Sequence, residues 1–466
     1  MKSPHLPLSN PYTGEVFDTV TPMSVEGVDR VVREARKAQA KWRAVSMADR
    51  CTVCEEFLRA LQSIGDDLAR EVTLQMGKPL TEAMAEVRVA IESAKAIIAM
   101  ADNALGELWL PEENGIERAV RQEALGVVLD IPSWNYPVLL ALRTLIPALL
   151  GGNAVILKHS TKTPLTGRSI AGAFEAGGGP FGLVQDIIGD AELTAAFAAH
   201  PGVDAIAFAG STAGGAAIRQ HASQHSKRLV LELGGNDPAF VCADADLDAA
   251  ARGLLRGVFE NAGQSAWAVE RIYIEKSVYD AFVERFTEHV RSLEMGDPMS
   301  GATTLGPLAT QRGPDDLQRI VQAAMTTDAR LLVGPSDFKR PETGWFFPPV
   351  VMGKVPQGCA LMRQECFGPV VGLRAVDTDE QAIELMNDSP YGLAASIWTQ
   401  DPDRTMRLAD KLEVGTVFLN ETGVFDPALP WSPAKGSGQG VTLSPWGLHQ
   451  FTRPKALHLR TGPPAR

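Results

Sequence analysis

The sequence lacks an uninterrupted apolar segment of the length that a membrane-spanning helix needs, which is about 20 residues. Its most apolar stretch, IPSWNYPVLLALRTLIPALLGGNAVIL, is interrupted by Arg143, by three prolines and by a Gly-Gly pair. The first residues, MKSPHLPLSNPYTGEVF, contain no apolar core of the kind found in secretory signals. We therefore expect a cytoplasmic protein without a membrane partner.

The sequence also lacks an excess of basic residues. Its 466 residues include 44 Lys and Arg against 56 Asp and Glu, which gives a formal net charge of -12. A chain of this charge is not expected to present a broad positive surface to a nucleic acid backbone or to anionic lipids. We therefore exclude nucleic acid as a partner and expect a small molecule as the ligand.

Cysteine and histidine are scarce. The five cysteines are Cys51, Cys54, Cys242, Cys359 and Cys366. Their odd number and irregular spacing predict reduced thiols. Cys51 and Cys54 form a CxxC pair, but ADRCTVCEEFLRALQSIG has helical apolar spacing and lacks the strand of a thioredoxin site. Of eight histidines only His221 and His225 have helical i, i+4 spacing, and no further ligand set accompanies them, so we expect no metal site.

Apolar periodicity predicts two α/β regions. Consecutive helices are expected from Ser24 to about Gly106. The β-branched runs GVVLDI, NAVILKH, GLVQDIIG and VDAIAFAG follow, with helical segments between some of them, which is typical of a parallel sheet with crossover helices. A second series begins near Gly234 with PAFVCADA, ERIYIEKSVYDAFVERFTEHV, CFGPVVGLRAV and AASIWTQDPDRTMRLADKL. The pattern predicts doubly wound α/β domains, and the length is sufficient for two or three domains.

One glycine-rich turn follows a predicted strand directly. In DAIAFAGSTAGGAAIRQ, residues 204–220, an apolar strand leads into Gly210, Ser211 and Gly215 and then into a helical pattern. Backbone N–H groups at a helix N-terminus favour an anion such as pyrophosphate, and glycine permits close approach. The stretch does not match GxGxxG, so taken alone it fits an ordinary strand-to-helix turn equally well.

Six further motifs occur in one order along the chain. They are PSWNYP (132–137), ILKHS (156–160), LELGGNDP (231–238), NAGQS (261–265), ECFGPVV (365–371) and PWSPAKGSGQG (430–440). With NPYTGEV near the start and KALHLRT near the end, this set resembles the aldehyde dehydrogenase superfamily over essentially the whole chain.

The resemblance implies an aldehyde dehydrogenase fold with a Rossmann-like cofactor domain, an α/β catalytic domain and a small β oligomerisation element. We expect the NAD(P)-binding domain over residues 1–105 and 125–233, and the catalytic domain over 234–440. The oligomerisation element is expected over 106–124 and 450–466. The resemblance further implies a small-molecule aldehyde as substrate and a homodimer or homotetramer as the assembly.

The resemblance implies catalytic roles for Asn135 and Glu232. In the family a cysteine thiolate attacks the aldehyde, an amide side chain and a backbone N–H hold the oxyanion, and hydride leaves for nicotinamide. Asn135 matches the amide donor, and Glu232 matches the general base that activates the hydrolytic water. Taken singly, Asn135 could instead cap a helix whose first turn contains Pro137, and Glu232 could be an ordinary ion-pair partner.

The resemblance also implies a site for NAD or NADP. Glu365 matches the residue that bonds the nicotinamide ribose, and Phe367 matches its apolar neighbour. Lys158 matches the lysine that holds the adenosine ribose, although taken alone it could be a solvated strand end. Trp134 is expected to line the same cleft. The pyrophosphate is assigned to the glycine-rich turn, namely to Gly210, Ser211 and Gly215.

The choice between the two cofactors depends on the residue three positions after Lys158. NAD-preferring relatives often carry a glutamate there, which bonds the ribose hydroxyls and repels a 2′-phosphate, whereas this chain has Thr161. His159 and Lys162 nearby do not repel a 2′-phosphate either. We expect the use of NAD⁺ or of both cofactors.

The nucleophile of the family is missing. The catalytic cysteine lies two residues after the glutamine of N-x-G-Q, and here Gln264 is followed by Ser265 and Ala266. A methyl group cannot attack a carbonyl, and the loss of a covalent nucleophile costs several orders of magnitude in rate. Ser265 has a high pKa and points elsewhere, and Cys366 would have to move to reach the substrate. The chain as written is therefore expected to be nearly inactive as an aldehyde oxidiser.

Two explanations account for Ala266. In the first, the parent enzyme has cysteine at this position and the chain is a Cys-to-Ala variant. In the second, the chain is a natural pseudoenzyme that binds nucleotide or acts as a structural scaffold. The oxyanion donor, the base and the ribose contacts are all retained, which favours a single replacement over long decay.

Four residues bear on the choice of aldehyde. Trp267 is expected either to narrow the pocket beside the reacting carbon or to pack in the core. Arg143 resembles the arginine with which succinate semialdehyde dehydrogenases hold the distal carboxylate of the substrate, but an interface or surface arginine fits its place almost equally well. Phe425 and Trp431 match aromatic tunnel positions, so an aromatic or short aliphatic aldehyde remains an alternative to a semialdehyde.

Overall fold

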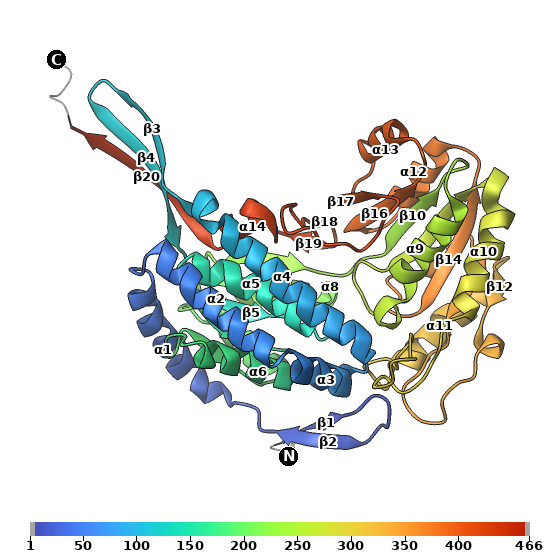
Figure 1. Ribbon diagram of the computed structural model, residues 1–466, viewed down its shortest axis with the longest axis horizontal. Coiled ribbons are helices and arrows are strands. Elements are labelled where there is room, and N and C mark those ends of the chain that lie inside the picture. Colours follow the sequence, from blue (N-terminus) through green and yellow to red (C-terminus); the bar gives the residue numbers. More distant parts are fainter. Residues whose placement is uncertain (1–4, 462–466) are drawn as a thin grey trace.

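Two large sheets organise the chain in the computed structural model, which describes residues 5–461 (Figure 1). The first sheet has the strand order β19-β9-β8-β5-β6-β7 and is parallel except for β19. Its strands are β5 (Val127–Ile131), β6 (Ala154–Leu157), β7 (Val184–Asp186), β8 (Ala205–Ala209), β9 (Arg228–Glu232) and β19 (Gly438–Gln439). The four β-branched runs before Gly210 thus form the predicted parallel strands.

The helices around the first sheet come almost entirely from the first half of the chain. They are α1 (Val28–Trp42), α2 (Met47–Ser63), α3 (Gly65–Met76), α4 (Leu80–Leu105), α5 (Pro137–Leu150), α6 (Pro164–Ala176), α7 (Ala191–Ala199), α8 (Thr212–Ala222) and α14 (Ser444–His449). Helix α5 is buried along its whole length and packs against α4 and β5. A helix that is apolar on all sides belongs in the core, and proline at its first position already has a helical φ.

The second sheet has the order β12-β13-β14-β11-β10-β16-β17, and only the β12–β13 pair is antiparallel. Its strands are β10 (Asp237–Val241), β11 (Val269–Glu275), β12 (Arg330–Val333), β13 (Val350–Gly353), β14 (Val370–Val376), β16 (Ala394–Trp398) and β17 (Thr416–Leu419). Its helices are α9 (Leu247–Phe259), α10 (Tyr279–Arg291), α11 (Gly313–Met325), α12 (Asp379–Asn387) and α13 (Pro402–Ala409). The second predicted α/β series is therefore confirmed.

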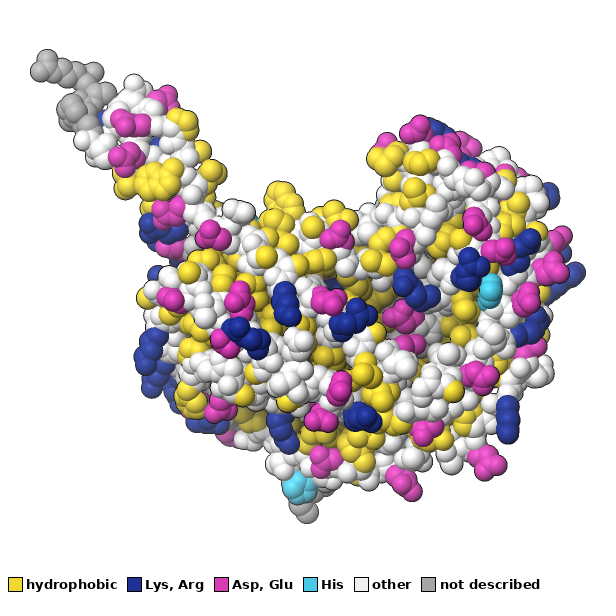
Figure 2. Space-filling model, in the orientation of Figure 1, with side chains coloured by type: hydrophobic (Ala, Val, Ile, Leu, Met, Phe, Trp, Pro, Cys, Tyr) yellow, Lys and Arg dark blue, Asp and Glu magenta, His cyan; other side chains and the backbone are white. Residues whose placement is uncertain are grey.

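A three-stranded antiparallel sheet projects from the first domain (Figure 1). It consists of β3 (Leu108–Glu113), β4 (Ile116–Ala124) and β20 (Thr452–Arg460). These strands fall within the two segments predicted to form the oligomerisation element, of which residues 462–466 lie outside the described part. Leu108, Trp109 and Leu110 are exposed there, and Figure 2 shows apolar side chains gathered on this projection.

Two short antiparallel strand pairs lie outside the larger sheets. They are β1 (Leu6–Ser9) with β2 (Val16–Val20), and β15 (Tyr391–Gly392) with β18 (Ala434–Lys435). The strand β19 lies within the segment predicted for the catalytic domain, yet it pairs with β9 and so belongs to the first sheet. The C-terminal part of 234–440 therefore returns to the first sheet.

Several expectations from composition can be followed in the structure. The CxxC pair lies on α2, where Cys54 is buried and Cys51 is half-buried, so the helical interpretation is confirmed. Within residues 5–461 no cluster of histidine, cysteine and carboxylate residues could hold a metal ion. No helix in the same range combines the length and apolarity needed to cross a bilayer. On the face in Figure 2, basic and acidic side chains are interspersed.

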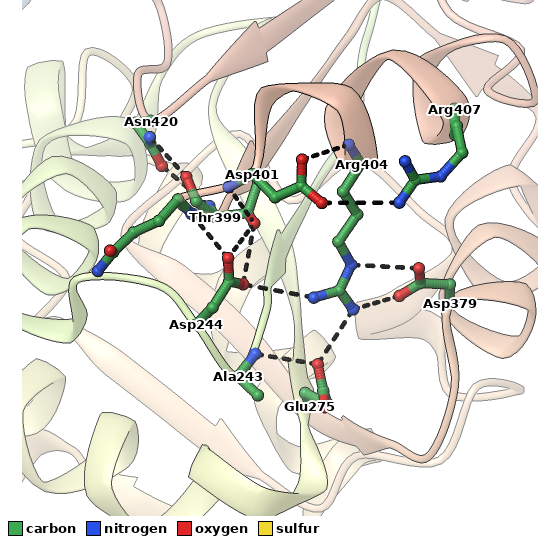
Figure 3. Close-up of polar contacts among 10 residues, drawn as sticks. Ala243, Asp244, Glu275, Asp379, Thr399, Asp401, Arg404, Arg407 and Asn420 are labelled. Carbon is green, nitrogen blue, oxygen red and sulfur yellow. Dashed lines mark hydrogen bonds and ion pairs between the residues drawn. The ribbon is translucent and has the colours of Figure 1, made fainter.

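An ion-pair network joins the strand ends of the second sheet (Figure 3). The guanidinium of Arg404, on α13, lies 3.4 Å from Asp244 and 3.1 Å from Glu275, and it also pairs with Asp379 at the start of α12. Asp244 in turn accepts a 2.7 Å hydrogen bond from Thr399 Oγ1. Hydrogen bonds to Asp379 and to Glu275 raise the pKa of Arg404, and a single cation thus connects segments that are distant in the sequence.

We expect Arg404→Gln to lower the free energy of unfolding by about 2–3 kcal/mol, because three carboxylates would lose their common cation in a partly buried site. The matched control is Arg407→Gln on the same helix. Arg407 is 64% exposed and forms a 3.7 Å pair with Asp401, so its loss is expected to cost less than about 1 kcal/mol. Urea denaturation of the two variants measures both effects, and equal midpoints would contradict this prediction.

Candidate active site

One cavity of about 270 Å³ collects most of the residues that the sequence analysis singled out. Its lining includes Trp134, Asn135, Gly210, Ser211, Glu232, Ala266, Trp267, Glu365, Phe367 and Trp431. The remaining candidates, Arg143, Lys158, Gly215 and Phe425, do not line it. Its lining includes the ends of β8 and β9 in the first sheet and loop residues that precede strands of the second sheet, and Ala266 is one of these loop residues.

The loop 260–266 reaches the cavity through a strained turn. Asn261 and Ala262 both have φ of 54°, and Gly263 has φ of 69°. The side-chain Nδ2 of Asn261 donates to the carbonyl oxygens of Asn135 and Gln264 at 3.0 and 3.2 Å. The side chain of Gln264 donates to Asn261 O at 3.0 Å and accepts from Ala309 N at 2.9 Å. The polar side chains of this motif therefore hold the backbone that presents Ala266.

Asn135 is oriented by the same loop. Its Nδ2 donates to Gln264 O at 3.0 Å, and the residue is 3% exposed. An amide fixed in this way needs no reorganisation before it donates to a developing oxyanion. The residue lies two positions before Pro137, and its side chain faces the loop rather than capping α5.

Glu232 ends β9 and lines the cavity. Its Oε2 lies 3.0 Å from Arg143 Nη1, and its Oε1 accepts a 2.6 Å hydrogen bond from Thr442 Oγ1. The ion-pair alternative is thus realised, and the same carboxyl group also faces the cavity. Thr442, which the sequence analysis did not find, follows the PWSPAKGSGQG motif by two residues.

Arg143 is buried behind the cavity wall. Its side chain is 2% exposed, and its guanidinium stacks over the ring of Phe425 at 4.3 Å. Burial lowers the pKa of Arg143, and the neighbouring charge of Glu232 opposes that shift. Nε and Nη2 have no hydrogen-bond partner in the described part of the chain. This edge of the guanidinium is the one that can bind a carboxylate through two parallel hydrogen bonds.

An aromatic cluster surrounds Arg143 and Ala266. The Trp267 ring lies 4.6 Å from Tyr136, 4.7 Å from Phe425 and 6.4 Å from Trp431. Phe425 and Trp431 contact each other at 4.8 Å. Trp267 is 9% exposed and lines the cavity, so it packs in the core and narrows the pocket at the same time.

The glycine-rich turn forms the start of α8. Ser211 is the N-cap, and its Oγ accepts from Gly214 N at 3.1 Å. Gly215 lies within α8 and faces Leu233, whose Cδ2 would be 2.5 Å from any added Cβ. The structure therefore places Gly215 at a helix-packing contact, whereas Gly210 and Ser211 line the cavity.

Lys158 and its neighbours lie at the end of β6. Lys158 is buried, and burial lowers the pKa of its amine to about 8 while Asp190 opposes the shift. His159 is also buried, with Nε2 3.1 Å from Pro137 O, and burial lowers its pKa to about 4. Lys162 stacks on Trp345 at 5.7 Å. His159 is thus neutral near pH 7, and no acidic side chain occurs between 158 and 162.

A buried carboxylate holds the segment that carries Glu365 and Phe367. Glu270 on β11 accepts hydrogen bonds of 2.9 Å from the backbone N–H groups of Cys366 and Phe367. Phe367, with φ of 54°, packs edge-on against Trp134 at 5.5 Å. Glu365 itself accepts from Gly235 N at 3.0 Å, and burial together with the charge of Glu270 raises the pKa of Glu365 to about 8. The only sequence signal for Glu270 is an acidic residue inside an apolar strand.

Two further buried carboxylates support the cavity from α4. Glu86 pairs with Lys78 and accepts from Val138 N and Leu139 N at 2.9 and 3.1 Å, at the start of α5. Glu82, one turn earlier, accepts from Asn261 N at 2.8 Å. Burial, reinforced by the charge of Glu260, raises the pKa of Glu82 to about 8. Their i, i+4 spacing on the buried face of a helix was a signal that the sequence analysis missed.

Comparisons with known proteins agree with this geometry. The profile of the Aldehyde dehydrogenase family matches residues 1–457. The chain is 36% identical to a succinate-semialdehyde dehydrogenase [NADP(+)] of Mycolicibacterium paratuberculosis, over 96% of this chain and 95% of the relative. It is 35% identical to an aldehyde dehydrogenase of Paenarthrobacter nicotinovorans, over 96% and 98%. The crystal structure of an aldehyde dehydrogenase from Brucella melitensis biovar abortus 2308 is similar with a TM-score of 0.94 at 30% identity, over 97% and 93%.

We expect Glu82→Gln to change how stability depends on pH. In the unfolded chain Glu82 ionises near its ordinary pKa of 4.5, whereas in the folded chain it stays protonated up to about 8. Its contribution to stability is therefore full below 4.5 and is lost as the pH rises through about 8. Glutamine does not ionise, so the variant does not lose this contribution. The unfolding free energy of Glu82→Gln minus that of the parent chain should therefore increase from about pH 5 to about pH 9.

Denaturant titrations across this pH range measure the effect. The control is Glu92→Gln on the same helix, since the side chain of Glu92 is 62% exposed. Parallel pH curves for the parent and Glu82→Gln would contradict the prediction.

Proposed function

Because the chain belongs to the aldehyde dehydrogenase family, we propose that its cavity binds NAD⁺ or NADP⁺ together with a small-molecule aldehyde. We further propose that a cysteine at position 266 confers NAD(P)-dependent oxidation of the aldehyde to the carboxylic acid. The observation that carries the proposal is the convergence of Asn135, Glu232 and position 266 on one cavity wall.

The residues of the cavity fit a dinucleotide. Gly210 and Ser211 line it at the N-terminus of α8, where backbone N–H groups favour a pyrophosphate. Glu365 and Phe367 line it as well and would hold the nicotinamide ribose, and Lys158 would hold the adenosine ribose. A bound nicotinamide would supply the hydride acceptor for oxidation at the carbonyl carbon of the substrate. A relative named for NADP(+) and the uncharged Thr161 both support use of NADP⁺.

Each polar residue of the wall has a task that its surroundings support. Asn135 donates a hydrogen bond to the substrate oxygen, and its amide is already fixed by Gln264 O at 3.0 Å. Glu232 orients and deprotonates water for the hydrolysis of a thioester, and its carboxylate is held by Arg143 and Thr442. Ala266 offers a methyl group where the thiolate is needed, so the chain as written binds an aldehyde without a covalent step.

The retention of this site supports Ala266 as a single replacement of a cysteine. Asn135, Glu232, Glu365 and Phe367 all keep positions on the cavity wall. The alternative is a natural pseudoenzyme that binds nucleotide or serves as a scaffold, and the intact cofactor side is compatible with it. The projecting sheet with its exposed Leu108, Trp109 and Leu110 supports a homodimer or homotetramer in either case.

Arg143 supports an aldehyde that carries a distal carboxylate. Its Nε and Nη2 are buried without a partner, and a carboxylate would satisfy both donors at once. Phe425, on which the guanidinium stacks, packs against Trp267 and Trp431, and these two rings line the cavity. An aromatic or short aliphatic aldehyde is the second candidate, because the same rings offer an apolar contact.

We expect Ala266→Cys to produce NAD(P)H from an aldehyde at least about 10⁴ times faster than the parent chain, because the covalent route is restored. Absorbance of the reduced cofactor measures this with acidic, aromatic and short aliphatic aldehydes. Ser265→Cys is the matched control, since it places a thiol one residue away on the same loop, and it should stay inactive. If the Ala266→Cys variant produces no NAD(P)H although it still binds the dinucleotide, the result would favour the pseudoenzyme.

We expect Arg143→Gln to weaken binding of a carboxylate-bearing semialdehyde by about 10- to 100-fold, because charge-assisted hydrogen bonds are lost. Calorimetry on the Ala266 chain measures affinity without turnover. Binding of a neutral aromatic aldehyde should change far less, and Arg143→Lys should lie between, since lysine keeps the charge without the fork. An equal loss for both ligands would assign Arg143 a purely structural role.

A further inference from the structure

A second, much smaller void lies behind Glu232. It measures about 10 Å³, which is close to what one water molecule requires. Its polar lining comes from Asp130, Thr144, Glu232 and Thr442. Glu232 also lines the large cavity, so its side chain forms a partition between the two spaces.

The strand register brings two carboxyl groups to this void. Asp130 on β5 is paired with Ala207 on β8, and Ala207 is paired with Val230 on β9. Neighbours in register share a face, and residues two apart on a strand share it too. Asp130 and Glu232 therefore point to the same face of the sheet, and the small side chain of Ala207 between them leaves the space open.

Asp130 is a buried group that the proposed mechanism does not use. It is 2% exposed, and one of its oxygens, Oδ2, has no hydrogen-bond partner in the described part of the chain. Burial raises the pKa of Asp130 well above its ordinary value, Thr144 opposes the shift through a hydrogen bond, and the charge of Glu232 adds to the rise. An unsatisfied buried oxygen beside a polar void indicates a missing hydrogen-bond partner.

We propose that this void holds one water molecule and that Asp130 is a positioning residue for Glu232. The protonated carboxyl of Asp130 donates to the water, and the water donates to Glu232, which remains the ionised member of the pair. Arg143 and Thr442 supply the other two donors to Glu232. The remaining polar side chains that line the void, Thr144 and Thr442, carry no charge and do not compete for the proton. The inference rests on the proposed function only in that Glu232 is the base.

Glu232 is thereby held from three sides, by a cation, a hydroxyl and a water. Two carboxylates beside one small void cannot both ionise without strong repulsion, so one of them retains a proton. Arg143 pairs with Glu232 and not with Asp130, which decides where the proton stays. Asp130 thus keeps the negative charge on the group that faces the substrate.

Infrared spectroscopy tests the proton position on the chain as it stands. The difference between the parent and Asp130→Asn at neutral pH is expected to contain the C=O stretch of a protonated carboxyl group. The difference between the parent and Glu232→Gln is expected to contain carboxylate bands instead. The reverse assignment, or no protonated carboxyl band in the Asp130→Asn difference, overturns the proposal. A crystal structure at high resolution with no water in the void also overturns it.

The pH profile of the Ala266→Cys variant tests the positioning role. Replacing Asp130 by Val removes the donor behind the water, so the acidic limb of the rate profile should move up by about one pH unit. Asp130→Asn keeps a donor and should restore the position of that limb. Asp130→Ala, which also removes the donor, serves if Asp130→Val does not fold, and the limb should again move up.

The matched control is Asp186→Val, because Asp186 on β7 is another largely buried carboxyl of the same sheet with an unpartnered oxygen. It lies two strands from β5 and should leave the acidic limb in place. An unmoved limb in both Asp130→Val and Asp130→Ala overturns the positioning role. An inactive Ala266→Cys variant contradicts the proposed function instead, and the infrared and crystallographic results still decide the inference.

Discussion

The ion pair between Arg143 and Glu232 is the contact on which the geometry of the site depends. A guanidinium with 2% of its side chain exposed carries a large desolvation cost, which a single carboxylate offsets only with good geometry and further partners. Here the cation also stacks on Phe425, and the carboxylate also accepts from Thr442. The pair therefore joins α5, the end of β9 and the segment after β19 into one wall of the cavity.

Other buried carboxyl groups hold the remaining walls of the cavity by accepting hydrogen bonds from the backbone N–H groups of those walls. Glu86 accepts the first N–H groups of α5, Glu82 accepts Asn261 N, and Glu270 accepts the N–H groups of Cys366 and Phe367. Each acceptor comes from an element distant in sequence from the segment that it holds. A positive-φ backbone such as that of Asn261 is strained, and the hydrogen bond from Asn261 N to Glu82 supports it.

The local part of this arrangement could be predicted from the sequence, and the non-local part could not. Periodicity identified α4, β-branched runs identified the parallel strands, and the order of the motifs pointed to Asn135, Glu232 and position 266. By contrast, Glu270 and Asp130 look like isolated acids in apolar strands until the strand register is known. Gly215 was assigned to pyrophosphate from its local motif, and its contact with Leu233 is a second, non-local reason for glycine at this position.

The hydrogen bonds that hold the loop 260–266 do not involve the side chain at position 266. Asn135 bonds to the carbonyl oxygen of Gln264, and Gly235 leaves room for the carbonyl oxygen of Ala266, which an added Cβ would approach to 1.8 Å. Preorganisation of the loop is therefore a property of its backbone and of its asparagine and glutamine side chains. Under the proposed function, a methyl group in place of a thiol would therefore remove the nucleophile without loosening the loop, and a ligand bound there would remain in contact with the groups that the loop positions.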